Sequence, residues 1–253
     1  ITSMNDGTPA YVTDRDIIYF IGENTVIKTL DGKKELTAAD LTHFITTRNA
    51  WEGYIFAYDE ETSGIVMRLD HYHCVCGGNG DVNGHEHDTA VTWTTADSLP
   101  DSAGNYYLTQ SVSGSWTVPT GEVNLCLNGQ TISGSITVGS GASLTLTDCS
   151  DSGKVQGEVL VNGGKFELYS GTITGGVQVG KKGGTYQTGS SFTMYGGAIT
   201  GNEDYGGVFL VGTTNHIAPP SFTMHGGTIS DNTAGASDGG GGGVYVGEKC
   251  SFT

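Results

Sequence analysis

Residues 191–202 read SFTMYGGAITGN, and this stretch decides the fold predicted for the chain. It returns as SFTMHGGTISDN over residues 221–232, and its first three residues return at 251–253. A looser copy, FELYSGTIT, occupies residues 166–174. A motif that recurs along a chain is typical of a protein built by stacking one structural unit on the next. The sequence therefore predicts a solenoid.

Each copy contains short strands separated by glycine turns. Phe192 and Met194 alternate with Thr193, which is the pattern of a strand with one buried face. The glycine pair at 196–197 turns the chain, and Ile199 opens a second strand. A valine-rich motif supplies a third strand, at residues 136–139, 159–162, 177–180, 208–212 and 244–247. Three strands per repeat predict that each repeat is one rung of a right-handed parallel β-helix.

The inward side chains of successive rungs are expected to form columns. Phe166, Phe192 and Phe222 hold equivalent positions in their repeats. Asn202 and Asn232 occupy equivalent turns, and we expect them to form an inward amide ladder. The strands keep their length along the chain, so the later repeats grow only in their turns.

The five cysteines are too few for a disulfide scaffold. Aligning Leu125 with Leu144 places Cys126 and Cys149 near successive rungs, with Cys149 several positions farther round its rung. A disulfide would require a turn that brings their Cα atoms within about 7 Å. We expect the two residues to remain thiols, and Cys250 has no obvious partner in the sequence.

The charge balance excludes one class of partner. The chain has 11 Lys and Arg against 27 Asp and Glu, a formal net charge of -16. Nucleic-acid binding requires a basic surface, so we expect none. No segment approaches the roughly 20 apolar residues that span a membrane. Because the sequence starts without Met and stops within a repeat, we expect it to be an excerpt of a longer protein.

Residues 1–70 do not repeat and are expected to form a small α+β domain. Strands are predicted at 16–21 and 25–30 as partners, followed by a helix that starts at Thr37. A hairpin is predicted from 53–58 and 64–69. This ββαββ order resembles the small immunoglobulin-binding domains of the protein G and protein L type. The resemblance implies immunoglobulin binding, and the anchors we expect, because Trp, Tyr and Arg dominate interfaces, are Arg48, Trp51 and Tyr54.

A histidine- and cysteine-rich junction is predicted over residues 71–95. Alternate residues of a strand share a face, so Cys74 with Cys76 and His85 with His87 are candidate ligands of one tetrahedral structural zinc. His71 and His73 are alternatives to either histidine of that set. The other interpretation is a polar linker whose cysteines are free or oxidised.

The chain from residue 71 onward resembles large repetitive surface proteins of anaerobic Gram-positive bacteria. The segments that carry the resemblance are HYHCVCGG at 71–78, GNYYLT at 104–109, WTVP at 116–119, LCLNG at 125–129 and the repeated Gly-Gly-x-Ile-x-x-Asn. In that group a β-helix is one module of a long secreted or wall-anchored chain that is regarded as adhesin-like. The resemblance implies a cell-surface location and an interaction with the host.

Three functions are compatible with a β-helix of this kind. A polysaccharide lyase or hydrolase would need catalytic side chains on an outward strand face, and Glu167 is the only acid there. A structural stalk would need no site. A binding module would place recognition residues on the lengthened turns, which carry Tyr186, Tyr205 and His216; the competing interpretation is that these turns vary because nothing constrains them.

We therefore expect a secreted, non-catalytic binding module, mainly β in fold. The small α+β domain covers residues 1–70, the junction 71–95, and the parallel β-helix 96–253, which is truncated within a repeat. The expected partner is a host protein or glycan, the expected cofactor is at most a structural zinc, and the chain is expected to be a monomer.

Overall fold

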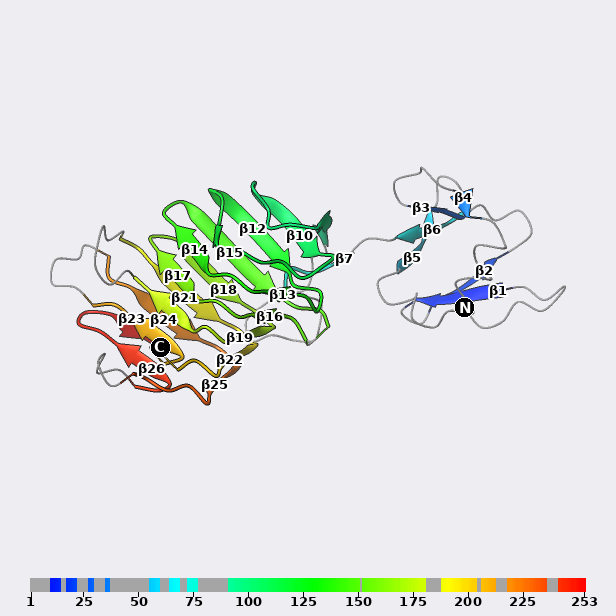
Figure 1. Cartoon of the computed structure of the whole chain (residues 1–253). Helices are drawn as coiled ribbons and strands as arrows, with labels where there is room; N and C mark the ends of the chain where they lie inside the picture. Colours follow the sequence, from blue (N-terminus) through cyan, green and yellow to red (C-terminus); the bar gives the residue numbers. More distant parts are fainter. Residues whose placement is uncertain are drawn as a thin grey trace. The chain divides into compact units, whose positions relative to one another are not determined.

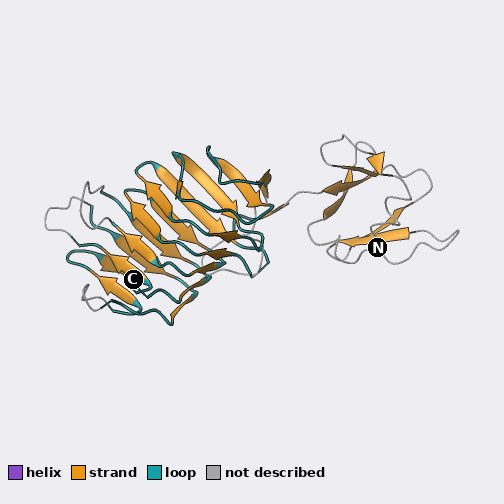
Figure 2. Cartoon of the chain, viewed as in Figure 1, coloured by secondary structure: helices purple, strands orange, loops and turns teal. Residues whose placement is uncertain are grey.

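The chain divides into two compact units, Ile1–Tyr72 and His73–Thr253. The computed structural model describes residues 10–14, 17–21, 27–29, 35–36, 55–59, 64–68, 72–76, 91–150, 152–180, 188–203, 206–212, 218–235 and 241–253. Figure 1 and Figure 2 show that strands supply all the regular structure of these described residues. The protein is therefore mainly β.

The described residues of the first unit form two sheets. β1 (Ala10–Asp14) pairs antiparallel with β2 (Ile17–Ile21), with Asp14 opposite Ile17. The second sheet has the order β4-β3-β6-β5. Its strands are β3 (Ile27–Thr29), β4 (Glu35–Leu36), β5 (Ile55–Asp59) and β6 (Gly64–Arg68). β3 is parallel to β6, and the other two pairs are antiparallel.

The predicted pairings of this unit are partly right. The hairpin is confirmed, because β5 and β6 pair antiparallel with Tyr58 opposite Ile65. The expected pairing of 16–21 with 25–30 is wrong, because β2 pairs with β1 and β3 pairs with β4 and β6. Only two residues separate β1 from β2 in the sequence, and two-residue connections are the commonest between antiparallel strands. The helix expected from Thr37 lies outside the described residues.

The second unit contains three parallel sheets, which we name the first, second and third. The first sheet consists of β9 (Thr94–Ala96), β10 (Gly104–Leu108), β12 (Gly121–Cys126), β15 (Ala142–Thr147), β18 (Lys165–Leu168), β21 (Ser191–Met194), β24 (Ser221–Met224) and β27 (Ser251–Phe252). The second consists of β13 (Thr131–Ile132), β16 (Lys154–Val155), β19 (Thr172–Ile173), β22 (Ala198–Thr200) and β25 (Thr228–Ser230). The third consists of β11 (Trp116–Thr117), β14 (Ile136–Gly139), β17 (Val159–Asn162), β20 (Val177–Val179), β23 (Val208–Leu210) and β26 (Val244–Val246).

From β12 onward the chain enters the first, second and third sheets in turn. Each strand then pairs in parallel with the strand one circuit later, as β12 does with β15, β13 with β16 and β14 with β17. Figure 1 shows the strands of one sheet as a row of arrows that follow the sequence colours. This arrangement is consistent with the predicted parallel β-helix. A further short sheet joins β7 (Tyr72–His73) to β8 (Val91–Thr92).

A column of phenylalanines runs through the core between the sheets. Phe192 lies opposite Phe166 on one side and Phe222 on the other. The ring centroids are 5.0 Å and 4.7 Å apart, and all three side chains are buried. Phe252 continues the column at 4.9 Å from Phe222. The predicted phenylalanine column is therefore confirmed.

The register of the first rungs differs from the predicted one. Leu125 lies opposite Leu146, and Val123 lies opposite Leu144, so the alignment of Leu125 with Leu144 is wrong. The two alignments differ by two residues. Side chains alternate between faces with a period of two, so both alignments keep the leucines in the core.

The glycine pairs of the repeat are required by the backbone. Gly197 and Gly227 have φ of +77° and +90°, a region that residues with a Cβ rarely adopt. A Cβ on Gly197 would also lie 2.7 Å from the carbonyl oxygen of Gly171 on the preceding rung. The second glycine of each pair therefore allows both the turn and the close approach of two rungs.

The two repeat asparagines lie on adjacent rungs. The backbone N–H of Asn202 donates to Oδ1 of Asn232 at 3.0 Å. The Nδ2 of Asn232 donates to the carbonyl oxygens of Ile199 and Ser230, at 2.9 and 2.8 Å. The Asn232 amide therefore joins the two rungs through hydrogen bonds to backbone groups.

Candidate functional site

Three of the residues considered for binding or metal ligation lie within the described part of the chain: Cys74, Cys76 and the alternative ligand His73, which ends β7. The others lie outside it: Arg48, Trp51, Tyr54, His71, His85, His87, Tyr186, Tyr205 and His216. The geometry of a candidate site is therefore built from the two cysteines and from what they contact.

Cys74 and Cys76 are buried against the outer side of the first sheet. Their exposed fractions are 7% and 3%, and they pack with Tyr169, with Val75 and Tyr195 at the margin. Tyr169 follows directly after β18, where the side chain faces away from the core. Burial, followed by the nearby charge of Glu167, raises the pKa of the Tyr169 hydroxyl. The chain just before the sheets thus covers part of their outer surface.

Tyr169 begins an outward column of stacked rings. Tyr195 lies 4.5 Å from Tyr169 between ring centroids, and His225 lies 5.0 Å from Tyr195, with interplanar angles of 12° and 11°. Rings stacked in this way cover one another's faces. Sugar rings bind to exposed faces of aromatic side chains. The ring faces that are stacked on one another within this column are covered and therefore cannot bind a sugar.

A second outer cluster lies near the start of the first sheet. Trp93, Tyr107 and Cys126 form a buried group. Val75, Val91 and Cys149 pack against it and are partly buried. Hydrogen bonding with the Cys149 side chain, and then burial, raises the pKa of the Cys126 thiol. Two cysteines from successive rungs therefore meet beneath residues of the predicted junction.

No family model, curated protein or solved structure matches this chain.

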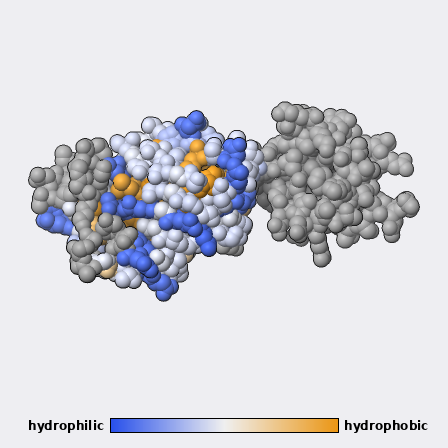
Figure 3. All heavy atoms as spheres, viewed as in Figure 1, coloured by the Kyte–Doolittle hydropathy of each residue, from blue (hydrophilic) through white to orange (hydrophobic). Residues whose placement is uncertain are grey.

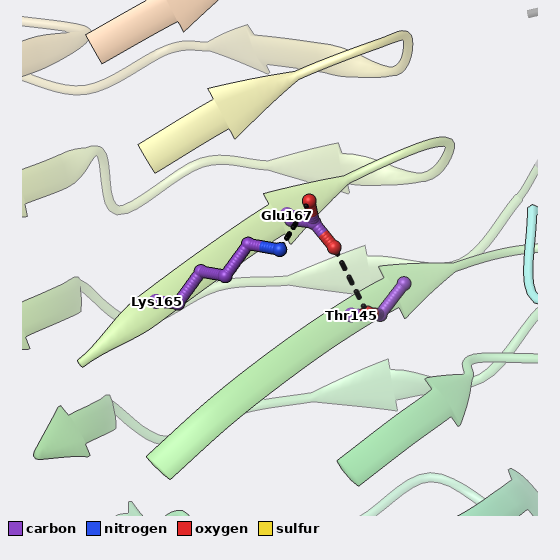
Figure 4. Close-up of polar contacts among 3 residues, drawn as sticks. All are labelled: Thr145, Lys165 and Glu167. Carbon is purple, nitrogen blue, oxygen red and sulfur yellow. Dashed lines mark hydrogen bonds and ion pairs between the residues drawn. The ribbon is translucent and has the colours of Figure 1, made fainter. Parts of the chain in front are cut away.

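Glu167, the one outward strand acid noted in the sequence, is held in an ion pair. Its Oε1 lies 2.9 Å from Nζ of Lys165, and Oγ1 of Thr145 donates to its Oε2 at 3.5 Å (Figure 4). Its register neighbours on the adjacent strands are Thr145 and Thr193. The carboxylate pair of a glycosidase is therefore not formed across the neighbouring described strands at this position.

Asp148 is a buried acid that the sequence analysis missed. Its Oδ1 accepts from the backbone N–H of Gly129 and its Oδ2 from that of Gly153, both at 2.7 Å. The side chain is 1% exposed. A carboxylate that accepts two backbone N–H groups from successive rungs holds the turns together. Its inward position after Leu144 and Leu146 was the signal that could have found it.

The described surface contains a small hollow. A hollow beside the third sheet is lined by Glu158, Gln178 and Phe209 among others, and has an empty volume of about 160 Å³ that is partly open to solvent. Pockets for small molecules usually enclose about 300–1,000 Å³. The hollow is too small for such a ligand.

The visible outer surface is polar with scattered apolar residues. Figure 3 shows hydrophilic and intermediate residues around small hydrophobic areas on the described part of the chain. Val246 and Phe252 are the large apolar side chains exposed among the described residues, at 43% and 46%. Among the same residues no helix is long and apolar enough to cross a membrane. The groups of three or more His, Cys, Asp or Glu that would hold a metal ion are also absent from the described ranges.

Proposed function

We propose that this chain is a non-catalytic binding module of a large bacterial cell-surface protein, secreted or anchored to the wall. Residues 96–253 form a right-handed parallel β-helix that carries recognition loops, as in adhesin-like proteins. The partner is a host glycoprotein or a glycan. The net charge of -16 disfavours a nucleic acid as the partner.

The observation that carries the proposal is the growth of one set of turns. Between the third and first sheets, β14 ends at Gly139 and β15 begins at Ala142, but β20 ends at Val179 and β21 begins only at Ser191. The next rung repeats this long connection between β23 and β24. The flanking strands pair in register, so both long connections start and end on adjacent rungs. Neighbouring long loops on a rigid scaffold are a common basis for recognition.

The binding experiment uses the full chain against immobilised immunoglobulin G, mucin and a glycan array. Replacing Tyr186 and His216 with alanine together is expected to weaken binding by about tenfold or more, because aromatic anchors dominate interfaces. Thr193→Ala, on the outward face of a strand, is the control and should leave affinity unchanged.

The first unit offers the alternative recognition surface. Its candidate anchors are Arg48, Trp51 and Tyr54, by resemblance to immunoglobulin-binding domains. Loss of binding in a variant with all three replaced by alanine, with the loop variant unaffected, would move recognition to residues 1–72. Binding to none of the probes would overturn the proposal in favour of a structural stalk.

A structural zinc is part of the proposal for the junction. Cys74 and Cys76 are two residues apart and both buried, which suits a pair of thiolate ligands completed by His85 and His87. Protein purified without chelator is expected to contain about one zinc per chain by elemental analysis. Chelation should then speed alkylation of both cysteines, because structural zinc contributes on the order of 10 kcal/mol to small motifs. Metal-free protein with unchanged alkylation would refute the zinc site.

A further inference from the structure

The corrected register brings two cysteines of successive rungs closer together than the sequence suggested. Cys126 ends β12 and lies opposite Thr147 of β15. The pairing continues past both strands, because the backbone N–H of Leu127 donates to the carbonyl oxygen of Thr147 at 2.8 Å. Cys149 follows two residues after Thr147. Cys126 therefore ends its strand, and Cys149 lies two residues past the end of the strand on the next rung.

The turns that carry the two cysteines are held against each other. The Asp148 carboxylate binds the backbone N–H of Gly129 on one rung and of Gly153 on the next, at 2.7 Å each. Sγ of Cys149 donates to Oδ1 of Asn128 at 3.5 Å. Cys149 is thus held over the turn that follows Cys126. The relative position of the two side chains is set by the fold.

The two thiols also share one enclosed environment. Cys126 is fully buried beneath Trp93 and Tyr107, and Cys149 packs at the edge of the same cluster. Both cysteines therefore belong to one side-chain cluster. Cys149 remains half-buried, so it is the one that solvent can reach.

We propose that Cys126 and Cys149 form a disulfide that cross-links two successive rungs when the protein meets a small-molecule disulfide. The Cys149 sulfur attacks the oxidant, forms a mixed disulfide and releases one thiol. The Cys126 sulfur then displaces the second thiol from Cys149, forming the S–S bond. The two cysteine protons leave with the two released thiols, so the oxidant takes up both electrons.

The order of the two steps follows from exposure. An oxidant in solution reaches half-buried Cys149 before fully buried Cys126. The second step needs the thiolate of Cys126, and burial, which persists in the mixed disulfide, raises the pKa of that thiol and slows this step at neutral pH. Raising the pH should therefore speed closure of the bond.

The test treats the reduced full chain with oxidised glutathione and maps its cysteines by peptide mass spectrometry. The expected result is a linked pair of peptides that contain Cys126 and Cys149, with a mass lower by two hydrogen atoms. The thermal midpoint should rise by roughly 5 °C or more on oxidation, because the bond closes a loop in the unfolded chain. Cys149→Ser should abolish the rise, and Cys250→Ser should retain it.

Two results would overturn the proposal. One is a stable glutathione adduct on Cys149 with no linked peptides, even at alkaline pH. The other is a linked pair in which Cys126 or Cys149 joins Cys74 or Cys76. Both results come from the wild-type chain, so they do not depend on the folding of a variant.

Discussion

Neighbouring residues of β21 have opposite roles. Phe192 is 1% exposed and lies between two other phenylalanine rings, whereas Thr193 faces outward and is partly exposed. The same alternation continues on β24 with Phe222 and Thr223. The stability of the stack therefore depends on one face of each strand.

Phe192→Ala is expected to lower the free energy of unfolding by about 3–5 kcal/mol, because it leaves a cavity between two stacked rings. Thr193→Ala, the control one residue away, should change it by less than about 0.5 kcal/mol. Urea unfolding of both variants and the wild type measures the difference. Similar losses in both variants would mean that the two faces are wrongly assigned.

Asp148 holds two turns from inside the stack. Asp148→Ala leaves the N–H groups of Gly129 and Gly153 without their acceptor, and each buried unpaired donor costs about 1–3 kcal/mol. We expect a loss of about 2–5 kcal/mol in urea unfolding. Asp101→Ala, at an exposed acid, is the matched control and should be near neutral. An equal, small effect of both changes would contradict a structural role.

At the scale of elements, residues 74–76 pack against Tyr169, which follows strand β18 of the first sheet. The contact links residues that are far apart in sequence, and it buries Cys74 and Cys76. The stretch 91–93 makes the second contact, through Trp93 on Tyr107. These two contacts attach residues 74–76 and 91–93 of the predicted junction to the strands of the second unit.

Tyr169→Ala should remove the surface that covers Cys74 and Cys76. Their alkylation by iodoacetamide, followed by mass spectrometry, is expected to be several-fold faster than in the wild type. His225→Ala, at the exposed far end of the same column, is the control and should leave the rate unchanged. Protection that survives the Tyr169 change would show that other contacts bury the cysteines.

At the scale of the whole molecule, the chain consists of two units, with the division in the sequence between residues 72 and 73. The second unit has one continuous apolar core between its three sheets. Its strands contact mainly the strands of adjacent rungs, as expected of stacked repeats.

Each unit is expected to unfold by itself. The full chain should give two thermal transitions in calorimetry, and a fragment of residues 73–253 should reproduce one of them with its midpoint within about 3 °C. A single transition of the full chain, with a midpoint far from that of the fragment, would show that the units stabilise each other.

The sequence by itself determined the stacked parallel strands and the phenylalanine column. Near-identical copies at 191–202 and 221–232 align in only one way, so Phe192 had to meet Phe222. The glycine pair located the turn in each copy. For the candidate site, the spacing of Cys74 and Cys76 pointed to the cysteines of the junction, but no pattern pointed to the residues that cover them.

The tertiary structure decided the register of the first rungs and the covering of the outer face. Apolar residues alternate with others through 123–127 and 142–147, so a shift of two residues keeps the core apolar. The sequence pattern therefore allows both registers, and the structure has Leu125 opposite Leu146. Cys74 meets Tyr169 across nearly a hundred residues of sequence. Contacts between the junction and the first sheet are not repeated along the sequence. They depend on the tertiary position of one non-repeating segment, so a repeat pattern does not predict them.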